Sequence, residues 1–403
     1  MESILLTTPP QFSVSEIACL ITSLKIDLFE AVSRPPFKAV PLRYILVVLK
    51  LRSLSYEVNM SAIPETPEEP RTEATPFRLF QAINAFHLTE AIRSAIELDI
   101  FTAIGAGNTT AEAVASHCGV AKRGARILCD FLVVNGFLSK SGNQYALSED
   151  SATFLDRKSP AYMGSCTEFL LTDDIRQNLR DLTNAVRQGG CRQTYAHAPE
   201  SPVWVAFARS MAPIMMMASQ GMAEIVTGGE KRPLKVLDIA AGHGLFGIAV
   251  LRANPKAEVT AVDWKNVLEV ARENAKKFGV ADRYRTVNGS IFDLDIGMGY
   301  DLILIPNFLH HFDEPTIAPL LNKLRHALKP GGKVATLEFV PEEDRVSPAV
   351  PAAFALIMLA ETPGGDAYTR AELEHMFNRA GFSRHEFHAM PPSPHSVLVS
   401  TRD

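Results

Sequence analysis

The second half of the chain alternates short apolar runs with amphipathic segments. Five runs of β-branched and other apolar residues predict buried strands, at 235–239, 258–262, 284–288, 301–305 and 333–339. Segments with helical periodicity separate most of them, at 246–254, 267–279 and 315–328. Apolar strands that alternate with helices are typical of an α/β, doubly wound parallel sheet covered on both faces. Residues 382–401 hold two strands without an intervening helix, which predicts an antiparallel pair.

The region before this sheet is predicted to be mostly helical. The apolar positions of 77–108 are typical of one helix, and 109–119 and 120–137 follow as a shorter and a longer helix. Residues 137–148 predict a hairpin closed by a Gly-Asn turn. Two helices followed by a hairpin form a winged-helix pattern. Residues 160–228 are predicted to be helical and are unusually rich in methionine.

The first 76 residues differ in character from the rest. The stretch 60–76 is rich in proline and glutamate, cannot bury a core and predicts a disordered linker. We expect Met60 to be a natural start and 1–59 an upstream extension; a small extra helical element is the alternative. The predicted organisation is therefore an extension and linker, a winged-helix domain, a helical connector that lines a substrate pocket, and a catalytic sheet domain, over 1–76, 77–160, 161–228 and 229–403.

Composition excludes some classes of protein. The 403 residues are 21% charged with a formal net charge of −5, which gives no global case for nucleic-acid binding. The five cysteines form no CxxC pair, as expected in a reducing compartment. No apolar run reaches the roughly 18 residues needed to span a membrane. The first residues lack a basic region followed by a long apolar one. A cytoplasmic protein is the expectation.

The sequence VLDIAAGHGLFG combines a glycine motif with a carboxylate. Gly242, Gly244 and Gly247 satisfy GxGxxG between a predicted strand and a predicted helix, a weak signal for a nucleotide when taken alone. Asp238 ends the strand, where a carboxylate suits a positively charged ligand better than a pyrophosphate. Asp263 ends the next strand and can accept hydrogen bonds from two ribose hydroxyls. Together these residues favour a ribonucleoside with an ammonium group over a dinucleotide.

At this point the chain resembles the class I S-adenosylmethionine-dependent methyltransferases. The resemblance rests on the order DIAAGHG, VDW, NGSIFD, DLILIPNFLHHF and LKPGGKVATLEF. Together with the winged unit, residues 77–403 resemble the small-molecule O-methyltransferases that include caffeate and antibiotic-tailoring enzymes. The resemblance implies a Rossmann-like sheet, S-adenosylmethionine as cofactor with S-adenosylhomocysteine as product, and no metal. It also implies a homodimer joined through the winged unit, which then binds no nucleic acid or membrane.

The resemblance assigns a cofactor site residue by residue. Gly242 and Gly244 would pass under the methionine moiety, Asp263 would hold the ribose, and Trp264 would pack on adenine. Members of the family commonly have a Gly-Asp pair after the third strand, where this chain has Gly289-Ser290. Ser290 would accept a weaker hydrogen bond, with Asp293 as an alternative. The predicted set is completed by Asp238, Ile291 and Asn307.

The stretch NFLHHFDEP follows the fourth strand and supplies a candidate base. A phenol has a pKa near 10, so methyl transfer to its oxygen benefits from a base that removes the proton. The resemblance places that base at His310, held by Glu338, and gives His311 a structural role near the cofactor. A metal site made of His310, His311 and Asp313 is a third interpretation. A second flanking glutamate of the family is replaced by Ala367, with Asp366 or Glu361 as possible substitutes.

The predicted acceptor site is apolar. Phe207 and Met211 match family positions that sandwich the acceptor ring, and Met358 and Thr362 match positions on the helix after the fifth strand. Residues at these spacings belong to a core as often as to a pocket. A planar apolar acceptor with a hydroxyl, a phenolic or polyketide-type metabolite, fits the methionine-rich surroundings.

The main prediction is therefore an O-methyltransferase acting on a small aromatic hydroxyl. An N- or C-methyltransferase, or a relative that uses the cofactor for other chemistry, is the alternative within the same fold. A winged-helix DNA-binding regulator is disfavoured by the acidic net charge, although Lys122, Arg123 and Arg126 lie on one predicted helix. A nicotinamide-dependent dehydrogenase is disfavoured by Asp238 and by the Leu-His pair after the fourth strand.

Overall fold

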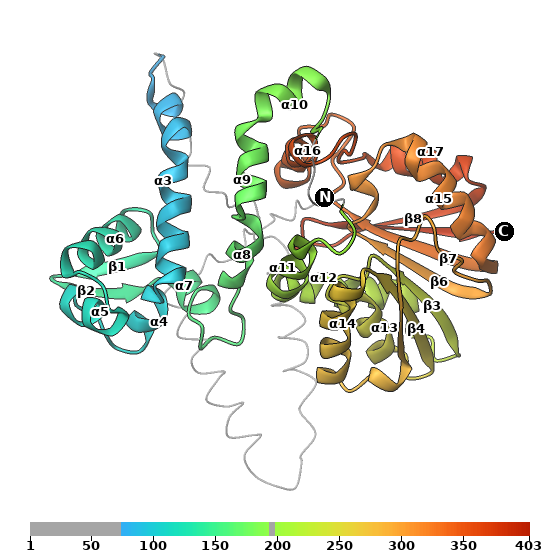
Figure 1. Cartoon of the computed structure of the whole chain (residues 1–403), viewed down its shortest axis with the longest axis horizontal. Helices are drawn as coiled ribbons and strands as arrows, with labels where there is room; N and C mark the ends of the chain where they lie inside the picture. The colour runs from blue at the N-terminus through green and yellow to red at the C-terminus, as the bar shows by residue number, and fades with distance from the viewer. Residues whose placement is uncertain (1–73, 193–197) are drawn as a thin grey trace, which may run out of the picture. The chain divides into compact units, whose positions relative to one another are not determined.

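The computed structural model describes residues 74–192 and 198–403 (Figure 1). The predicted extension, most of the linker and the start proposed at Met60 lie outside the described residues. Within the described part, the main sheet has seven strands in the order β5-β4-β3-β6-β7-β9-β8. They are β3 (Leu234–Ile239), β4 (Ala257–Asp263), β5 (Tyr284–Asn288), β6 (Tyr300–Pro306), β7 (Leu328–Glu338), β8 (Phe382–Ala389) and β9 (Ser396–Arg402).

The first five of these strands are parallel, and β9 runs antiparallel between β7 and β8. The five predicted parallel strands and the final antiparallel pair are therefore confirmed. The helices that accompany them are α13 (Leu245–Ala253), α14 (Lys265–Lys277), α15 (Glu314–Ala327), α16 (Ala349–Glu361) and α17 (Arg370–Arg379). Because parallel strands need crossover connections, this alternation of strand and helix covers both faces of the sheet.

Two separate cores lie on the two faces of the sheet. Val236 and Leu237 are neighbours in β3, and both are fully buried, but they belong to different clusters. Val236 faces the cluster formed with α12, α13 and α14, whereas Leu237 faces the cluster formed with α15 and α17 (Figure 1). Burying a side chain of this size contributes roughly 1.5–3 kcal/mol. A central strand with both faces buried fixes the register of its neighbours and of the loops that follow them.

The N-terminal unit has the predicted winged-helix order. It contains α3 (Phe77–Glu97), α4 (Ile100–Gly105), α5 (Ala111–Cys118), α6 (Lys122–Val134), the hairpin β1 (Leu138–Ser141) and β2 (Gln144–Leu147), and α7 (Glu149–Phe154). Its core includes Phe101, Leu132 and Tyr145. The prediction of one helix over 77–108 is wrong, because the chain breaks at Asp99, which has a left-handed φ of 61°. After the break, α4 packs into the core of this unit, whereas α3 is mostly exposed.

Two of the three basic residues of α6 are paired with carboxylates of the same unit. Lys122 pairs with Glu112, and Arg126 lies 2.9 Å from Asp130. Asp130 also accepts a hydrogen bond from Tyr145 Oη at 2.7 Å, which ties the hairpin to α6. This pattern is typical of a solvated helix face, which agrees with the interpretation against DNA binding.

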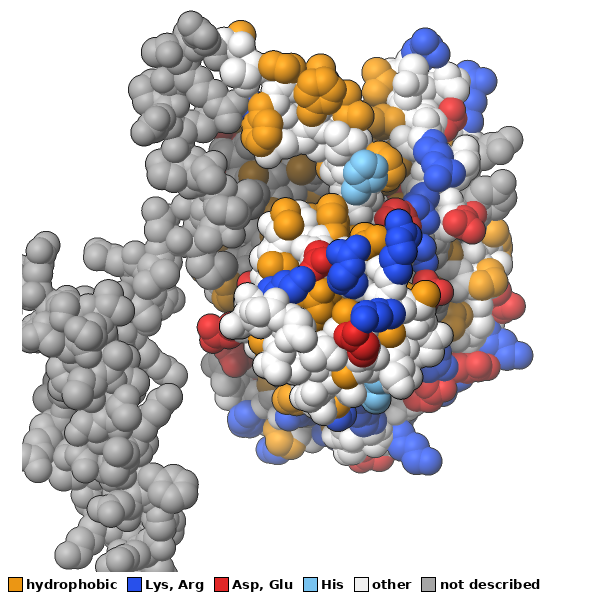
Figure 2. Space-filling view, turned by 90° about the vertical axis from the view of Figure 1, so that its left-hand side faces the viewer, with side chains coloured by type: hydrophobic (Ala, Val, Ile, Leu, Met, Phe, Trp, Pro, Cys, Tyr) orange, Lys and Arg blue, Asp and Glu red, His pale blue; other side chains and the backbone are white. Residues whose placement is uncertain are grey.

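One side of α3 exposes a row of large apolar residues. Phe77, Leu79, Phe80, Ile83 and Phe86 are each 54–60% exposed. They appear as a patch of apolar side chains along the helix in Figure 2. At about 100° per residue, Leu79, Phe80, Ile83 and Phe86 lie within about 120° of one another around the helix, and Phe77 lies beside Phe80. A contiguous apolar stripe exposed to water is typical of a surface that binds another protein chain.

The connector is helical only in part. It consists of the 3₁₀ turn η2 (Gly164–Cys166) and of α8 (Thr167–Leu170), α9 (Asp173–Arg180), α10 (Leu182–Gln188), α11 (Pro202–Ser210) and α12 (Ala212–Thr227). The region 160–228, predicted to be helical, is divided into these separate helices in the residues that the structure describes. Ser165 Oγ donates to the carbonyl of Ser210 at 3.2 Å, which joins two parts of the connector. Asn178 donates to Glu361 at 2.8 Å, which attaches the connector to α16 of the sheet domain. None of the described helices could cross a membrane.

Candidate active site

The glycine motif forms a tight loop between β3 and α13. Gly242 and Gly244 have left-handed φ values of 55° and 76°, which favour glycine. A Cβ on Gly244 would lie 2.6 Å from Tyr284 Oη, so this position has no room for a side chain. The loop ends at Leu245, the first residue of α13, and the N–H groups of Leu245 and Gly247 in this first turn are bonded to side chains of the same loop and strand.

Asp263 joins the end of β4 to this loop. Its Oδ2 accepts a hydrogen bond from the backbone N–H of Gly242 at 2.8 Å, and its Oδ1 accepts from the N–H of Trp264 at 2.7 Å. A carboxylate has about four acceptor sites, so two further donors can still bind. Burial raises the pKa of Asp263 to about 6, while the N–H groups of Gly242 and Trp264 act in the opposite direction. The group is mainly ionised at neutral pH.

Asp238 lies beneath the loop and is fully buried. Its Oδ2 accepts from the N–H of Gly247 at 3.0 Å, and its Oδ1 has no hydrogen-bond partner among the described residues. Burial raises the pKa of Asp238 well above its usual range, against the effect of the Gly247 N–H. A Cβ on Gly247 would lie 2.7 Å from Asp238 Oδ2, which explains the third glycine of the motif. Asp238 therefore stabilises the first turn of α13 through this hydrogen bond.

The loop after β5 lies beside Asp263. The N–H of Gly289 donates to the carbonyl of Asp263 at 3.0 Å. Ser290 Oγ accepts from the N–H of Phe292 at 3.2 Å, and Ile291 is buried. The ring of Trp264 is partly buried against Ala208, Val267 and Val270. The predicted adenine contacts thus belong to two loops that meet at the carboxyl ends of β4 and β5.

His310 is held by Glu338 at the carboxyl ends of β6 and β7. His310 lies in the 3₁₀ turn η5 (Leu309–His311), and its Nδ1 is 2.5 Å from Glu338 Oε2. Glu338 Oε1 accepts from the backbone N–H groups of Phe308 and Leu309, at 3.1 and 2.9 Å. Both side chains are at most 5% exposed. Nδ1 donates to the carboxylate, which leaves Nε2 as the proton acceptor of the ring.

His311 has different surroundings from its neighbour. Its ring is half-buried and lies edge-on 5.6 Å from Trp204, on α11. The carboxylate of Glu338 is bonded to His310 and not to His311. Asn307, with a left-handed φ of 51°, ends β6 just before this turn, and its Oδ1 has no partner among the described residues.

The Pro-Gly-Gly segment after α16 packs against the His310 turn. A Cβ on Gly365 would collide with the carbonyl oxygen of His310, and Tyr368 Oη donates to the carbonyl of Phe312 at 2.5 Å. Ala367, which occupies the position of the family's second glutamate, is fully buried. The suggested substitutes lie elsewhere: Asp366 pairs with Arg345 at 3.1 Å, and Glu361 binds Asn178. Among the described residues, the recorded hydrogen-bond partner of the His310 ring is Glu338.

The predicted acceptor residues fall into two groups. Phe207 lies against Gly242 and stacks on His243, with its ring 5.1 Å from Phe169. Met211 is buried in the core cluster that includes α12 and α13. Met358 is buried on α16, and the hydroxyl of Thr362 is used locally, because it donates to the carbonyl of Met358 and accepts from the N–H of Gly365.

Several residues at the site were not predicted. His243, between the two loop glycines, is buried, and its Nδ1 accepts from the N–H of Leu245 at 3.2 Å. Burial lowers the pKa of His243 to about 4, so the ring is neutral at pH 7. Phe339 and Phe354 form a stacked pair next to His310. The central histidine of GHG was a visible signal in the sequence, whereas the phenylalanines lie in no recognisable motif.

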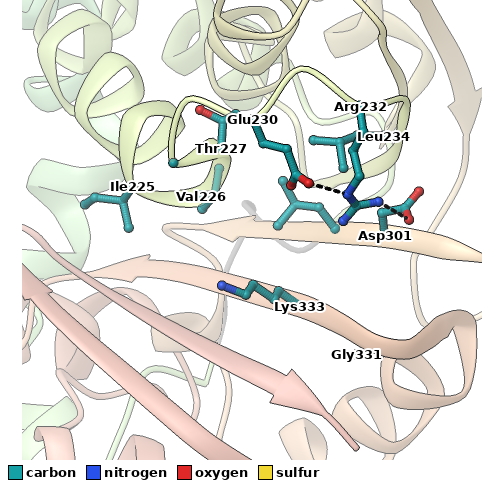
Figure 3. A pocket seen from close by; sticks show the side chains of 11 residues that line it. Ile225, Val226, Thr227, Glu230, Arg232, Leu234, Asp301, Gly331 and Lys333 are labelled. Atoms are coloured by element: carbon teal, nitrogen blue, oxygen red, sulfur yellow. Dashed lines mark hydrogen bonds and ion pairs between the residues drawn. The ribbon is translucent and has the colours of Figure 1, made fainter.

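The hollow in Figure 3 lies at the opposite edge of the sheet. It is lined by residues at the amino ends of β3 and β6, and Arg232 there bridges Glu230 at 2.6 Å and Asp301 at 3.0 Å. None of the predicted site residues lines it. In the part of the chain that the structure describes, no group of three His, Cys, Asp or Glu side chains could hold a metal ion. The predicted cofactor and base residues lie instead at the carboxyl ends of the strands, where open α/β sheets commonly bind ligands.

Comparisons with known proteins agree with this geometry. The chain matches a model of the O-methyltransferase dimerisation domain over residues 80–157 and one of the O-methyltransferase domain over residues 179–383. A solved structure from Nostoc punctiforme, assigned as a candidate O-methyltransferase, is 49% identical, covers 82% of this chain and 100% of its own, and has a TM-score of 0.79. The glycine loop, Asp263, His310 and Glu338 all lie within the second matched range.

Two curated relatives differ in the atom that their names specify. The tetracenomycin polyketide synthesis 8-O-methyltransferase of Streptomyces glaucescens is 26% identical over 76% of this chain and 91% of its own length. The L-tyrosine C(3)-methyltransferase of Streptomyces lavendulae is 24% identical over 88% of this chain and 100% of its own length.

The raised pKa of Asp263 predicts how stability changes with pH. An acid with a pKa of about 6 in the folded protein and near 3.8 in the unfolded chain binds its proton more tightly when folded. Protonation therefore stabilises the fold as pH decreases through about 6, and Asp263→Asn removes this contribution. As the pH is lowered from about 7.5 to 4, the free energy of unfolding of the wild type should rise by up to about 3 kcal/mol relative to that of the variant. Chemical denaturation measures this, with Glu258→Gln on the same strand as control. A difference that does not change with pH contradicts the prediction.

Proposed function

Because this chain belongs to the O-methyltransferase family and is an S-adenosylmethionine-dependent methyltransferase, we propose that it methylates a hydroxyl group of a small aromatic or polyketide-type metabolite. The observation that carries the proposal is the pair of His310 and Glu338 at the carboxyl ends of β6 and β7. An oriented imidazole there suits an acceptor that must lose a proton. An acceptor atom that carries no acidic proton would not need it.

His310 acts as the general base in this proposal. Glu338 accepts the Nδ1–H of His310 and so fixes both the tautomer and the orientation of the ring. Nε2 then accepts the proton of the acceptor hydroxyl. A positioned base of this kind contributes typically 10²–10⁴-fold in rate. The carboxylate also stabilises the imidazolium that forms, since an opposite charge within hydrogen-bond distance favours the protonated ring.

The residues at the glycine loop suit S-adenosylmethionine. The cofactor supplies a methyl group on a positively charged sulfur. Gly242 and Gly244 allow the backbone to approach a ligand closely, and Asp263 retains acceptor capacity for ribose hydroxyls. The buried Oδ1 of Asn307, without a partner among the described residues, is a further acceptor beside the loop. We assign Trp264, Ser290 and Ile291 to the adenine side and Asp238 to support of the loop.

We assign the acceptor to the apolar space between α11 and the His310 turn. Phe207 and Trp204 on α11 supply aromatic walls, and Phe354 lies edge-on to His310 at 4.9 Å. Aromatic side chains bind planar rings through offset or edge contacts. We retain Met211 and Met358 as apolar neighbours of this space. Thr362 is less suited to bind an acceptor, because its hydroxyl already has a donor and an acceptor in the chain.

We further propose that two copies of the chain form a dimer through the N-terminal unit. The family model for residues 80–157 is that of a dimerisation domain. The apolar stripe of α3, from Phe77 to Phe86, is exposed to water. Burying such a stripe against a second copy would remove apolar surface from water on both chains.

Methyl transfer to carbon is the second candidate function. It is favoured by the similarity to an L-tyrosine C(3)-methyltransferase over the whole length of that protein. A phenol oriented by His310 also becomes more electron-rich at its ring carbons when it loses its proton. Nuclear magnetic resonance of the product separates the two functions, because an O-methyl and a C-methyl group have distinct carbon shifts.

Cofactor affinity should depend on Asp263. Asp263→Ala removes the acceptor for the ribose hydroxyls, and each lost hydrogen bond to a charged group costs about 1.5–3 kcal/mol. The affinity for S-adenosylhomocysteine, measured by calorimetry, should fall at least tenfold. Glu258→Ala, also on β4 but exposed, is the matched control. Unchanged affinity in a folded Asp263→Ala protein would refute the ribose assignment.

The base can be tested by comparing two adjacent alanine variants. His310→Ala should lower the single-turnover rate by about 10²–10⁴. Raising the pH toward the pKa of the phenol should recover part of this rate, because phenolate then forms without the base. The affinity for S-adenosylhomocysteine should stay near that of wild type. The measurement requires an acceptor found by screening phenolic metabolites with labelled cofactor.

His311→Ala is the matched comparison for this base. It should show weaker cofactor binding or lower stability, with a smaller loss of rate and no recovery at high pH. A larger, pH-rescued defect in His311→Ala would move the base to that residue. If neither variant loses rate, proximity alone promotes the transfer or the acceptor is not a hydroxyl.

The dimer can be tested at the apolar stripe of α3. Introducing charge with Phe80→Asp and Ile83→Asp should shift the protein to a monomer at micromolar concentration, because charged side chains cannot be buried unpaired. Light scattering measures the mass. Met298→Asp, an exposed apolar residue of the sheet domain, is the control and should remain dimeric. A monomeric wild type would count against the dimer.

A further inference from the structure

A row of four aromatic rings runs from His310 to His395. Phe354 lies edge-on to His310 at 4.9 Å, and it stacks on Phe339 at 4.1 Å. Phe339 in turn lies 4.2 Å from the ring of His395. Phe339 directly follows β7, and His395 directly precedes β9. Because Glu338 and Ser396 are paired across these strands, the two residues lie side by side.

The hydrogen bonds of His395 leave one ring nitrogen available. Ser393 Oγ lies 2.9 Å from Nδ1, and it also accepts the backbone N–H of His395 at 3.3 Å. Ser393 Oγ can donate its hydroxyl hydrogen to Nδ1, and in that tautomer the ring hydrogen is on Nε2. Nε2 is buried and has no hydrogen-bond partner among the described residues. The side chain is 4% exposed.

The ring of His395 is neutral at physiological pH. Burial lowers the pKa of His395 to about 4, and the nearby His310 acts in the same direction. A neutral imidazole with a free N–H is a donor for an oxygen, and it does not compete with His310 for the proton of the reacting hydroxyl. Buried donors in proteins almost always have a partner, so this one indicates a ligand group or an ordered water.

We propose that the Nε2–H of His395 binds a second oxygen of the acceptor, at the far end of a fused-ring phenol whose reacting hydroxyl meets His310. The inference rests on the proposed function, because it needs His310 at the reacting oxygen. In this proposal the ligand lies along the two phenylalanine rings as well as both imidazoles, so it is wider than one phenol ring. The row offers an apolar surface for fused rings and one polar group at each end. The chemical class is therefore a polycyclic phenol with a hydroxyl or carbonyl oxygen on its distal ring.

Calorimetry with three naphthols tests this contact without requiring turnover. The full-length protein is saturated with S-adenosylhomocysteine and titrated with 2-naphthol, 2,6-dihydroxynaphthalene or 2,3-dihydroxynaphthalene. The 2,6 compound, which carries an oxygen at each end, should bind about five- to tenfold more tightly than 2-naphthol, as expected for one additional hydrogen bond. The 2,3 compound carries its second oxygen on the same ring and should show no such gain. Equal affinity for all three, or no binding of any, overturns the proposal.

Two variants assign the gain to His395. His395→Phe keeps an aromatic ring without a donor and should abolish the gap between the 2,6 compound and 2-naphthol. His395→Gln keeps an N–H donor and should retain part of it. A gap that survives in His395→Phe overturns the proposal. If His395→Phe does not fold, as judged by circular dichroism, the affinities of the three naphthols for the wild type and for His395→Gln still test the contact with His395.

Failure of the proposed function has a different signature. If labelled S-adenosylmethionine transfers no methyl group to any hydroxylated acceptor while the affinity gap persists, the contact with His395 stands and hydroxyl methylation does not. If methylation is observed but the gap is absent, hydroxyl methylation stands and His395 has no role in acceptor binding.

Discussion

The reactive edge of the sheet depends on the burial of one carboxylate, that of Glu338. A charge removed from water is costly unless donors surround it. Glu338 is 2% exposed and has three donors: the N–H groups of Phe308 and Leu309, and Nδ1 of His310. The first two are backbone groups of a 3₁₀ turn that the strand of β6 cannot satisfy. The carboxylate therefore stabilises the turn that carries His310 and orients its ring. Its position at the last residue of β7 is fixed by the register of β7 with β6 and β9.

The cofactor side of the site uses the same arrangement at two other strand ends. Asp263 ends β4 and accepts the N–H groups of Gly242 and Trp264; Asp238, one residue before the end of β3, accepts that of Gly247. In each case an acid at the carboxyl end of a parallel strand satisfies backbone donors of a neighbouring loop or helix start. Burial disfavours the ionised form of both aspartates and raises their pKa values. The two aspartates thus hold the loops although their charged forms are costly to bury. Under the proposed cofactor assignment, the structure of the loops and the binding of the ligand depend on the same side chains.

The sequence predicted the strands, the glycine loop and the turn after β6, because these depend on local signals: apolar runs, glycines in a fixed spacing, and acids that end strands. The sequence did not predict the break in the first helix, because this break depends on the conformation of one residue, the left-handed φ of Asp99. It also could not find groups that come together from distant parts of the chain. Phe339 directly follows β7, Phe354 lies in α16 and His395 directly precedes β9, and no sequence spacing connects them. For Thr362, the sequence suggested a residue that lines the acceptor pocket, but its hydroxyl forms hydrogen bonds within the chain.

The replacement of a second flanking glutamate by Ala367 changes how the base is held. In this chain the approach of the Pro-Gly-Gly segment is steric: Gly365 lies so close to the carbonyl of His310 that any side chain would collide with it. Tyr368 adds a hydrogen bond to the carbonyl of Phe312, and Thr362 holds the N–H of Gly365. Packing and backbone hydrogen bonds thus confine the turn in addition to Glu338. A single carboxylate then suffices for orientation, because the remaining freedom of the ring is limited by Phe354 and by the ring of His311, 4.3 Å away. With one carboxylate beside it, the ring of His310 has mainly aromatic neighbours, an environment that suits the aromatic acceptor we propose.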